Sequence, residues 1–192
     1  LAQFAQRAGP TLMALLREPG VTHVAVAFDH VIESFRNRLY SGYKTGEGLP
    51  PELVAQFPLA EEATRALGVV VWPMVEFEAD DAIGTLAKRA AESGHRVIVS
   101  TGDKDLAQLV NERVSLINTM SNETLDVPGV NAKFGVPPER ILDYLTLTGD
   151  AVDNVPGVDK VGPKTAVKWL AQYGTLDNLM QHAGEVGGVV GE

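Results

Sequence analysis

The sequence contains no cysteine, which excludes disulfide bonds and thiolate metal sites and fits a reducing compartment. Its four histidines, His23, His30, His95 and His182, are scattered without the spacing of metal ligands, and we interpret them as structural or surface residues. No run approaches the roughly 18 consecutive apolar residues of a membrane span, and no secretory signal opens the chain. What is left is a chain of 192 residues, 45% of them hydrophobic, which predicts one domain or one and a half and no membrane association.

The negative charge of the chain is concentrated in a few places. A formal net charge of −9 at pH 7 argues, taken alone, against a nucleic-acid-binding protein. Eight acids that follow apolar runs or share one loop account for nearly the whole excess: Asp29, Glu78, Asp80, Asp81, Asp103, Asp105, Asp150 and Asp153. If these acids share a pocket, they predict a divalent-metal site, because carboxylate oxygens are the preferred ligands of Mg²⁺ and Mn²⁺.

Three short apolar runs predict strands of a parallel sheet. Residues 21–28, 69–73 and 96–100 are apolar at nearly every position, as expected for strands buried on both faces. Acidic residues follow each run, and helical segments lie between the runs. This order is typical of right-handed βαβ units, and ligands of such sheets bind beyond the carboxyl ends of the strands.

The remaining pattern predicts helices and one hairpin. In the first part of the chain we expect helices over 1–18 (interrupted at Gly9-Pro10), 52–67 (ended by Gly68), 80–92 and 106–110, and an edge hairpin over 113–118 and 123–126. From residue 127 onward the sequence favours helices that are separated by glycines. There we expect helices over 130–134, 138–148, 162–170 and 176–181, and a poorly ordered tail from 184.

Local chemistry alone leaves the role of several acids open. Glu78, Asp80 and Asp81 also suit the first turn of a helix, where the dipole and free N–H groups favour negative charge. Asp29 could equally be a helix cap or a turn residue. The repetition of acids at several strand ends favours the metal-site interpretation.

Two further segments carry features of nucleic-acid binding. In residues 34–48, cations alternate with aromatic rings, as a single strand requires, although a solvated helix and a glycine-rich loop would look similar. In residues 157–165, two glycines flank a tight turn before a helix that begins with a lysine and a threonine. Backbone N–H groups of such a turn, with the helix dipole, bind phosphate without reading sequence.

Taken together, these motifs resemble the 5′–3′ exonuclease domain of bacterial DNA polymerase I, within the flap endonuclease family of PIN-like nucleases. The matching segments span nearly the whole chain, in the family's order: Ala27-Phe28-Asp29, Phe35-Arg36 with Tyr43-Lys44, Glu78-Ala79-Asp80-Asp81, Ser100-Thr101-Gly102-Asp103-Lys104-Asp105, Gly149-Asp150 to Asp153-Asn154, and Pro156-Gly157-Val158 to Gly162-Pro163-Lys164-Thr165-Ala166.

The resemblance implies an architecture. It is α/β, with a central, mainly parallel sheet and flanking helices (PIN-like), followed by a small helical subdomain with a helix-three-turn-helix motif. The nuclease core would span residues 1–126, with an arch or gateway at about 34–50. An incomplete DNA-binding subdomain would span 127–192.

The resemblance also implies residue roles. Asp29, Glu78, Asp80 and Asp103 would hold a first Mg²⁺ or Mn²⁺ ion, and Asp105, Asp150 and Asp153 a second ion, with Asp81 adjacent. Lys44, with Arg36 and Tyr43, would stand at the gateway and act in catalysis. The duplex would be gripped, often with a K⁺ ion, by the hairpin residues Gly157, Val158, Gly162, Lys164 and Thr165.

The implied activity is metal-dependent hydrolysis of DNA phosphodiesters at 5′ ends, nicks, gaps and flaps in replication and repair, leaving a 5′-phosphate. We expect a monomer in the bacterial cytoplasm, associated with the nucleoid, with a polymerase in the same polypeptide as a candidate partner. Two alternatives stay open: a PIN-like ribonuclease using the same acids, and a duplex-DNA-binding module without catalysis.

Three positions depart from the family pattern. No strand with a metal-binding aspartate precedes Leu1, and from the abrupt start we expect a truncated sequence. Glu47 stands where the family usually has an arginine three residues after the gateway lysine, which weakens the expected steering of phosphate. The helical subdomain also stops soon after its hairpin, without closing helices.

Overall fold

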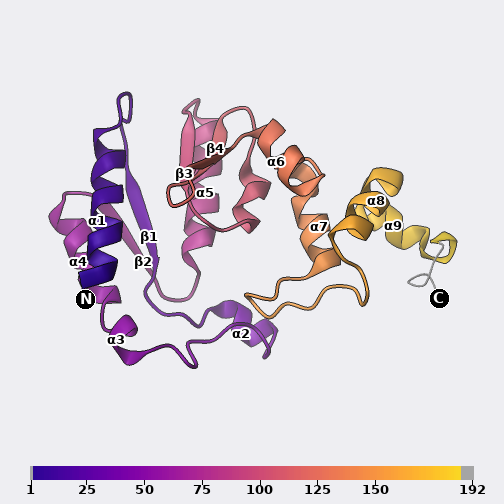
Figure 1. The fold of residues 1–192 in the computed structure, drawn as a ribbon, viewed down its shortest axis with the longest axis horizontal. Helices are drawn as coiled ribbons and strands as arrows, with labels where there is room; N and C mark the ends of the chain where they lie inside the picture. Colours follow the sequence, from indigo (N-terminus) through magenta and orange to yellow (C-terminus); the bar gives the residue numbers. More distant parts are fainter. Residues whose placement is uncertain (1, 187–192) are drawn as a thin grey trace. The chain divides into compact units, whose positions relative to one another are not determined.

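The computed structural model describes residues 2–186, with side chains from residue 9 onward. It is an α/β chain with two compact units, Leu1–Thr85 and Leu86–Glu192, shown in Figure 1. We describe each unit by itself. Within residues 2–186, no helix has the length and apolar character needed to cross a membrane.

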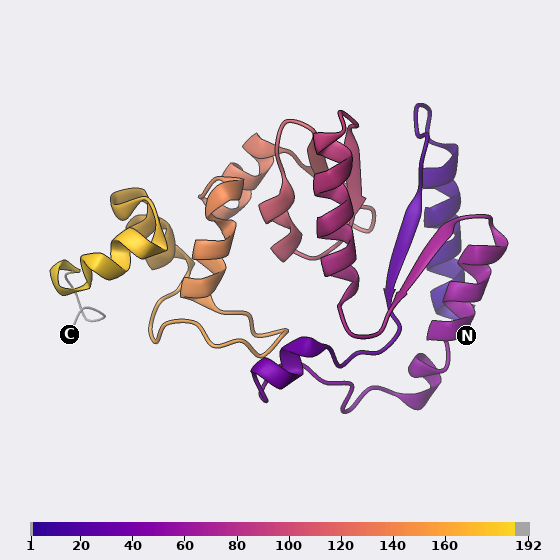
Figure 2. The same ribbon diagram turned by 180° about the vertical axis from the view of Figure 1, so that it is seen from behind.

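The first unit is built around two parallel strands. Strands β1 (Ala25–Asp29) and β2 (Val70–Met74) pair in register, with Asp29 opposite Met74 at their carboxyl ends. Helix α4 (Phe57–Ala66) packs against β2, as both views show (Figures 1 and 2). The other helices of this unit are α1 (Ala2–Arg17), α2 (Phe35–Leu39), α3 (Pro51–Val54) and the start of α5 (Ala79–Glu92).

Three elements of the first unit differ from the predicted ones. Helix α1 continues through Pro10, so the predicted interruption is wrong. The single helix expected over 52–67 is two helices, α3 and α4, because Pro58 lies in the first turn of α4, where its missing N–H costs nothing. Strand β1 begins only at Ala25, which shortens the strand predicted over 21–28.

The second unit contains a mixed sheet. Strand β3 (Val97–Ser100) pairs in parallel with β4 (Val114–Asn118), which pairs antiparallel with β5 (Glu123–Leu125). The α/β class and the edge hairpin are therefore confirmed. Among residues 2–186 the strand ladders form two sheets, one in each unit, where one central sheet was expected. The segment after β3 is a 3₁₀ helix, η1 (Asp105–Leu109), in place of the predicted α-helix.

Short helices complete the second unit. They are α6 (Val127–Phe134), η2 (Pro138–Arg140), α7 (Ile141–Thr148), α8 (Pro163–Tyr173), α9 (Leu176–Gln181) and η3 (Ala183–Glu185). Helix α7 packs against η1 on one side and α8 on the other, and an extended loop joins α7 to α8 (Figure 2). The tail predicted from residue 184 lies outside the described residues from 187 onward.

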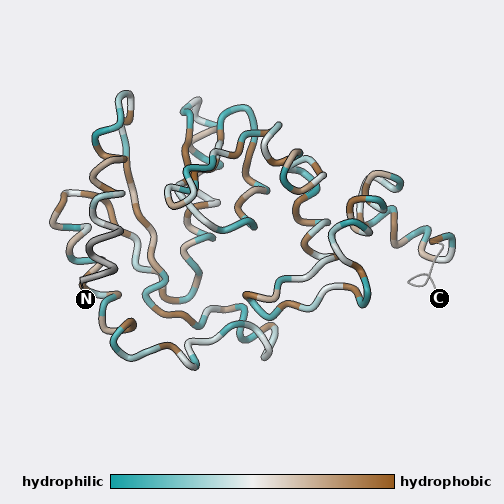
Figure 3. The backbone as a smooth tube through the Cα atoms, viewed as in Figure 1, coloured by the Kyte–Doolittle hydropathy of each residue, from teal (hydrophilic) through white to brown (hydrophobic). Residues whose placement is uncertain are grey.

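Burial follows the strand pairing. The middle strand β4 is buried at Val114 and Leu116, each 2% exposed. Edge strands are less covered: Val70 of β2 is 54% exposed and Ile98 of β3 is 61% exposed, although both segments are hydrophobic (Figure 3). The prediction of strands buried on both faces therefore fails at these positions.

Two glycines allow the backbone to cross itself beside α7. A Cβ added at Gly157 would lie 2.4 Å from the carbonyl carbon of Thr148, and one added at Gly149 would lie 2.3 Å from the Gly157 nitrogen. Gly149 also has a φ of +72°, which favours glycine. The loop that carries Asp150 is thus fixed at its base by close backbone packing.

We expect Gly157→Ala to lower the free energy of unfolding by about 3 kcal/mol, because backbone atoms cannot move aside as flexible side chains can. Urea unfolding of the variant measures this. Gly184→Ala is the matched control, since a Cβ there meets nothing within 4 Å. Equal stability of the two variants would contradict the predicted crowding.

Candidate active site

One group of acids lies at the carboxyl ends of the strands in the first unit. Asp29 ends β1, and its Oδ1 accepts a hydrogen bond of 2.6 Å from the backbone N–H of Ala79, at the start of α5. Asp80 and Asp81 occupy the first turn of the same helix. Asp80 and Asp81 thus lie in the first turn of a helix, as predicted. The parallel pairing places the carboxyl ends of β1 and β2 side by side.

Glu78 is the buried member of this group, with only 3% of its surface exposed. Its Oε1 accepts hydrogen bonds from Ser34 Oγ at 2.7 Å and from Arg36 Nη1 at 3.2 Å. Its Oε2 accepts from the Tyr43 hydroxyl at 3.2 Å and pairs with Lys44 Nζ at 3.0 Å. The three predicted gateway residues thus converge on one of the predicted metal ligands.

Helix α2 holds the gateway residues because its sequence caps it. Ser34 and Asn37 form a capping box at the start of the helix: the Ser34 hydroxyl accepts a hydrogen bond from a backbone N–H of the first turn, and Asn37 Oδ1 accepts one from the Ser34 N–H. Asn37 Nδ2 also donates to the carbonyl of Lys44 at 2.9 Å, which fixes the chain beyond the helix. Ser34 was not predicted as a site residue. A capping signal in the sequence marks its local role, but its bond to Glu78 depends on folding.

Opposite charges determine the ionisation of this group. Burial alone would raise the pKa of Glu78, but hydrogen bonds from Ser34 and Lys44 and the charges of Lys44 and Arg36 outweigh it and lower the pKa. The pKa of Asp81 is lowered chiefly by its two-point contact with Arg36, whose nitrogens lie 2.8 and 2.9 Å from its oxygens. Both carboxylates are therefore charged at neutral pH.

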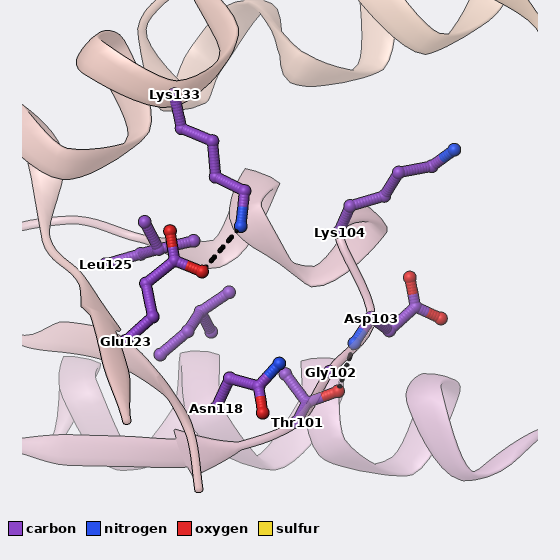
Figure 4. Close-up of a pocket in the computed structure, with 9 residues that line it drawn as sticks. Thr101, Gly102, Asp103, Lys104, Asn118, Glu123, Leu125 and Lys133 are labelled. Carbon is purple, nitrogen blue, oxygen red and sulfur yellow. Dashed lines mark hydrogen bonds and ion pairs between the residues drawn. The ribbon is translucent and has the colours of Figure 1, made fainter. Parts of the chain in front are cut away.

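The second unit holds another group of acids, beginning where β3 ends. The Thr101 hydroxyl accepts a hydrogen bond from the Asp103 N–H at 2.9 Å, and Asp103 Oδ1 accepts from the Asp105 N–H at 2.8 Å. These turns lead directly into η1. Figure 4 shows Thr101 and Asp103 at the rim of a small hollow, whose far side is closed by an ion pair between Glu123 and Lys133.

The loop after α7 brings Asp150 to the same group. Asp150 and Val155 exchange backbone hydrogen bonds of 2.8 and 2.7 Å, which close the loop. Asp150 Oδ1 accepts from the N–H groups of Val152 and Asp153, and its Oδ2 pairs with Lys104 Nζ at 2.9 Å. Lys104 belongs to a recognised motif, yet sequence reasoning gave it no role, because nothing local indicates its distant partner.

Asp105 is the most perturbed acid of the second unit. Burial first, and then the charges of Asp103 and Asp150, raise its pKa from an ordinary 3.8 to about 6. Its Oδ1 is buried without a hydrogen-bond partner. The pKa of Asp150 is lowered instead, because hydrogen bonds from Lys104 and from the loop backbone outweigh the effect of burial. Two neighbouring carboxyl groups thus have opposite shifts.

The chemistry of these donors fits a hard divalent cation. All are carboxylate oxygens, and the orphaned Asp105 Oδ1 is an acceptor that a cation would satisfy. Among residues 2–186, no three acidic or histidine side chains stand ready as a ligand set, and lysine or arginine occupies several of the oxygens. The prediction that Asp103 also serves the first ion is not tested by either unit taken by itself.

The predicted hairpin before α8 presents exposed backbone. Gly162 caps α8 without a side-chain hydrogen bond, and Pro163 and Lys164 are exposed in the first turn. Val161 is 6% exposed and anchors the turn beneath. Helix α8 thus offers an uncapped N-terminus beside a lysine, which suits a phosphate group.

Comparisons with known proteins place the chain in a family. The family model for the N-terminal resolvase-like domain of 5′–3′ exonucleases matches residues 5–135, and the model for the C-terminal SAM fold of 5′–3′ exonucleases matches residues 136–192. The chain belongs to the 5′–3′ exonuclease family. The resemblance drawn from the motifs is confirmed.

Relatives of two lengths match the chain. DNA polymerase I of Rhizobium leguminosarum is 45% identical over 166 residues, which cover 86% of this chain and 16% of the relative. A 5′–3′ exonuclease of Aquifex aeolicus is 38% identical over 172 residues, which cover 89% of this chain and 60% of the relative. The chain therefore spans only part of the length of these relatives.

Solved structures share the fold. A T5 5′-exonuclease with bound divalent zinc ions has a TM-score of 0.83 at 21% identity, covering 97% of this chain and 73% of its own. A T5 D15 flap endonuclease in a pseudo-enzyme-product complex with DNA and metal ions has a TM-score of 0.82 at 19% identity, covering 97% and 72%. At these identities the likeness establishes the fold.

Proposed function

We propose that this chain is a divalent-metal-dependent, structure-specific 5′ nuclease, a 5′–3′ exonuclease and flap endonuclease acting on DNA. The observation that carries the proposal is the acidic group of the second unit, in which Asp105 has a raised pKa and an orphaned buried oxygen beside Asp103 and Asp150. Family membership and the metal-bound and DNA-bound structural neighbours support it.

The proposed ligands of Mg²⁺ or Mn²⁺ are the carboxylates already described. Asp103, Asp105, Asp150 and Asp153 would serve in the second unit, and Asp29, Glu78, Asp80 and Asp81 in the first. When bound, such cations activate water and stabilise the leaving oxygen of a phosphodiester. The chain itself supplies partly buried carboxylates held on hydrogen-bonded turns, and the lysine and arginine partners of several of them would have to give way to the ions.

The gateway residues would act on the DNA strand. Arg36 and Lys44 are half-buried cations held beside aromatic rings, with Arg36 Cζ 4.7 Å from the Phe35 ring centre and Lys44 Nζ 5.4 Å from that of Tyr43. A phosphate can replace Glu78 as the partner of these cations, while Tyr43 orients them. We therefore assign Lys44, Arg36 and Tyr43 to substrate positioning and charge stabilisation.

The hairpin would grip duplex DNA through its phosphates. Gly157, Val158 and Gly162 are exposed residues of this hairpin, and Lys164 and Thr165 stand in the first turn of α8. A K⁺ ion at this hairpin stays part of the proposal. Contacts of this kind give steep salt dependence and little sequence preference.

Lys164→Ala is expected to weaken duplex binding roughly fivefold and to lower the salt slope by about 1, uniformly across sequences. Fluorescence anisotropy with two duplexes of unrelated sequence, over a range of salt concentrations, measures both quantities. Lys88→Ala removes an exposed lysine from α5 and serves as the control. A variant that loses binding to one duplex and not the other contradicts a phosphate contact.

Substrate class is tested by competition. The full chain is given a 5′-flap DNA duplex and a single-stranded RNA together, with Mg²⁺ and then with EDTA. We expect flap cleavage that EDTA abolishes. Preferential RNA cleavage would instead indicate the PIN-like ribonuclease, and DNA binding without cleavage the non-catalytic module.

The cellular setting of the activity follows from the same proposal. DNA with 5′ ends, nicks or flaps arises in replication and repair, and several relatives are named DNA polymerase I. We therefore propose a polymerase domain in the same polypeptide, action as a monomer, and a place in the bacterial cytoplasm at the nucleoid. The division into a nuclease core over 1–126 and a DNA-binding subdomain over 127–192 belongs to this proposal.

A further inference from the structure

Lys104 has an unusual position among the acids of the second unit. It stands between Asp103 and Asp105 in sequence, and its Nζ lies 2.9 Å from Asp150 Oδ2. Figure 4 shows that its side chain extends away from the Glu123–Lys133 pair on the other side of the hollow. The lysine thus connects the turn after β3 to the loop after α7.

The contact of Lys104 occupies an oxygen that a metal ion needs. Asp150 Oδ1 is already used by the N–H groups of Val152 and Asp153, at 2.7 and 3.3 Å. Oδ2 is the oxygen with which Asp150 could reach an external cation, and Lys104 holds it. The Asp150 side chain is 12% exposed and that of Lys104 41%, so the ammonium can leave toward solvent while the carboxylate cannot.

We propose that Lys104 is an exchangeable internal cation, which holds the acidic group together without metal and is displaced from Asp150 when a divalent cation binds. This rests on the proposed metal binding at Asp103, Asp105, Asp150 and Asp153. The physical reason is charge balance: four neighbouring carboxylates repel one another, one ammonium offsets part of that repulsion, and a doubly charged ion offsets more of it. Lys104 therefore lowers metal affinity while it stabilises the metal-free protein.

Removing the charge tests the exchange. Lys104→Met keeps most of the stem, and we expect it to bind Mn²⁺ roughly fivefold more tightly than the wild type, in calorimetric titration of the full chain. In EDTA the variant should also melt at a lower temperature than the wild type. Added Mn²⁺ should raise its melting temperature by more than it raises that of the wild type. Lys104→Arg keeps the charge and should bind Mn²⁺ within about twofold of the wild type.

Lys133→Met is the matched control. Lys133 is also 41% exposed and also pairs with one carboxylate, Glu123, at 2.8 Å, but outside the acidic group. Its replacement should leave Mn²⁺ affinity unchanged. Unchanged or weaker Mn²⁺ binding by Lys104→Met overturns the inference, whereas absence of Mn²⁺ binding by the wild type overturns the proposed function beneath it.

A second measurement needs no variant. Acetylation of the wild type by acetic anhydride, followed by peptide mass spectrometry, reports how free each ammonium is. We expect Lys104 to become several-fold more reactive when Mg²⁺ is added, since its Nζ is released from Asp150, while Lys133 stays constant. Equal Lys104 reactivity with and without Mg²⁺, at saturating metal, contradicts the exchange.

Discussion

Glu78→Gln is expected to lower the free energy of unfolding by about 2–3 kcal/mol and to reduce cleavage by about a thousandfold. The amide keeps the volume of the side chain but removes the charge that Arg36 and Lys44 face in a site with 3% exposure. Arg36 keeps its ion pair with Asp81 in the variant, so the loss of stability should be smaller than if both cations lost their only partner. Denaturant unfolding and a flap-cleavage assay measure the two effects.

The pH dependence identifies the charge as the cause. Because the folded-state pKa of Glu78 is lowered, its contribution is complete above the ordinary value of 4.5 and is lost as the pH falls through the folded value. The stability difference between wild type and variant should therefore be full at pH 7 and shrink below pH 4.5.

A surface ion pair provides the control for Glu78→Gln. Glu76→Gln removes the partner of Arg38, whose nitrogen lies 2.7 Å away, but both side chains are at least 60% exposed. We expect a loss of less than about 0.5 kcal/mol. If both variants lose the same stability, the burial and convergence at Glu78 are not what stabilises the first unit.

Asp105→Asn should strongly reduce cleavage yet stabilise the metal-free protein. The raised pKa means that the carboxylate of Asp105 is disfavoured in the folded state, so the wild type bears a cost once the side chain is charged. The rise of the pKa from 3.8 to about 6 corresponds to about 3 kcal/mol, and solvent screening at this half-buried side chain reduces the expected gain to about 1 kcal/mol. Cleavage should fall about a thousandfold, because a proposed ligand is lost.

The pH dependence of stability shows whether the charge of Asp105 causes this difference. Protonated Asp105 matches asparagine, so the two proteins should be equally stable below pH 3.8, and the advantage of the variant should grow through about pH 6. Thermal melts in EDTA from pH 4 to pH 8 measure it. Glu112→Gln, an exposed acid of the same unit, is the control and should show no such rise. A variant less stable than the wild type at pH 8 in EDTA would show that charged Asp105 does not destabilise the folded protein.

The sequence predicts most elements because their signals are local. Alternating strand, acid and helix segments are correctly placed around Asp29, Glu78 and Asp103, and Gly68 ends its helix as expected, with a φ of +78°. The helix break between Val54 and Phe57 was missed because the apolar spacing continues across it. The exposure of Val70 and Ile98 was missed because an apolar run does not show which of its side chains other elements cover.

The site is less predictable than the fold. The acids were found as a class, because carboxylates at strand ends recur along the chain. Their partners were not found, since Ser34 meets Glu78 and Lys104 meets Asp150 only after folding. The opposite pKa shifts of Asp105 and Asp150 depend on burial and on the contact of Lys104 with Asp150, neither of which can be read from a motif, although Lys104 itself belongs to one.

The most direct test of the central claim is the metal dependence of DNA cleavage. The full chain, stripped with EDTA, is incubated with a 5′-labelled flap duplex while Mg²⁺ is added back stepwise. We expect no cleavage without metal and a saturable rise with Mg²⁺, with the new end of the duplex carrying a 5′-phosphate. Cleavage at the same rate in EDTA, or none at saturating Mg²⁺, would contradict it.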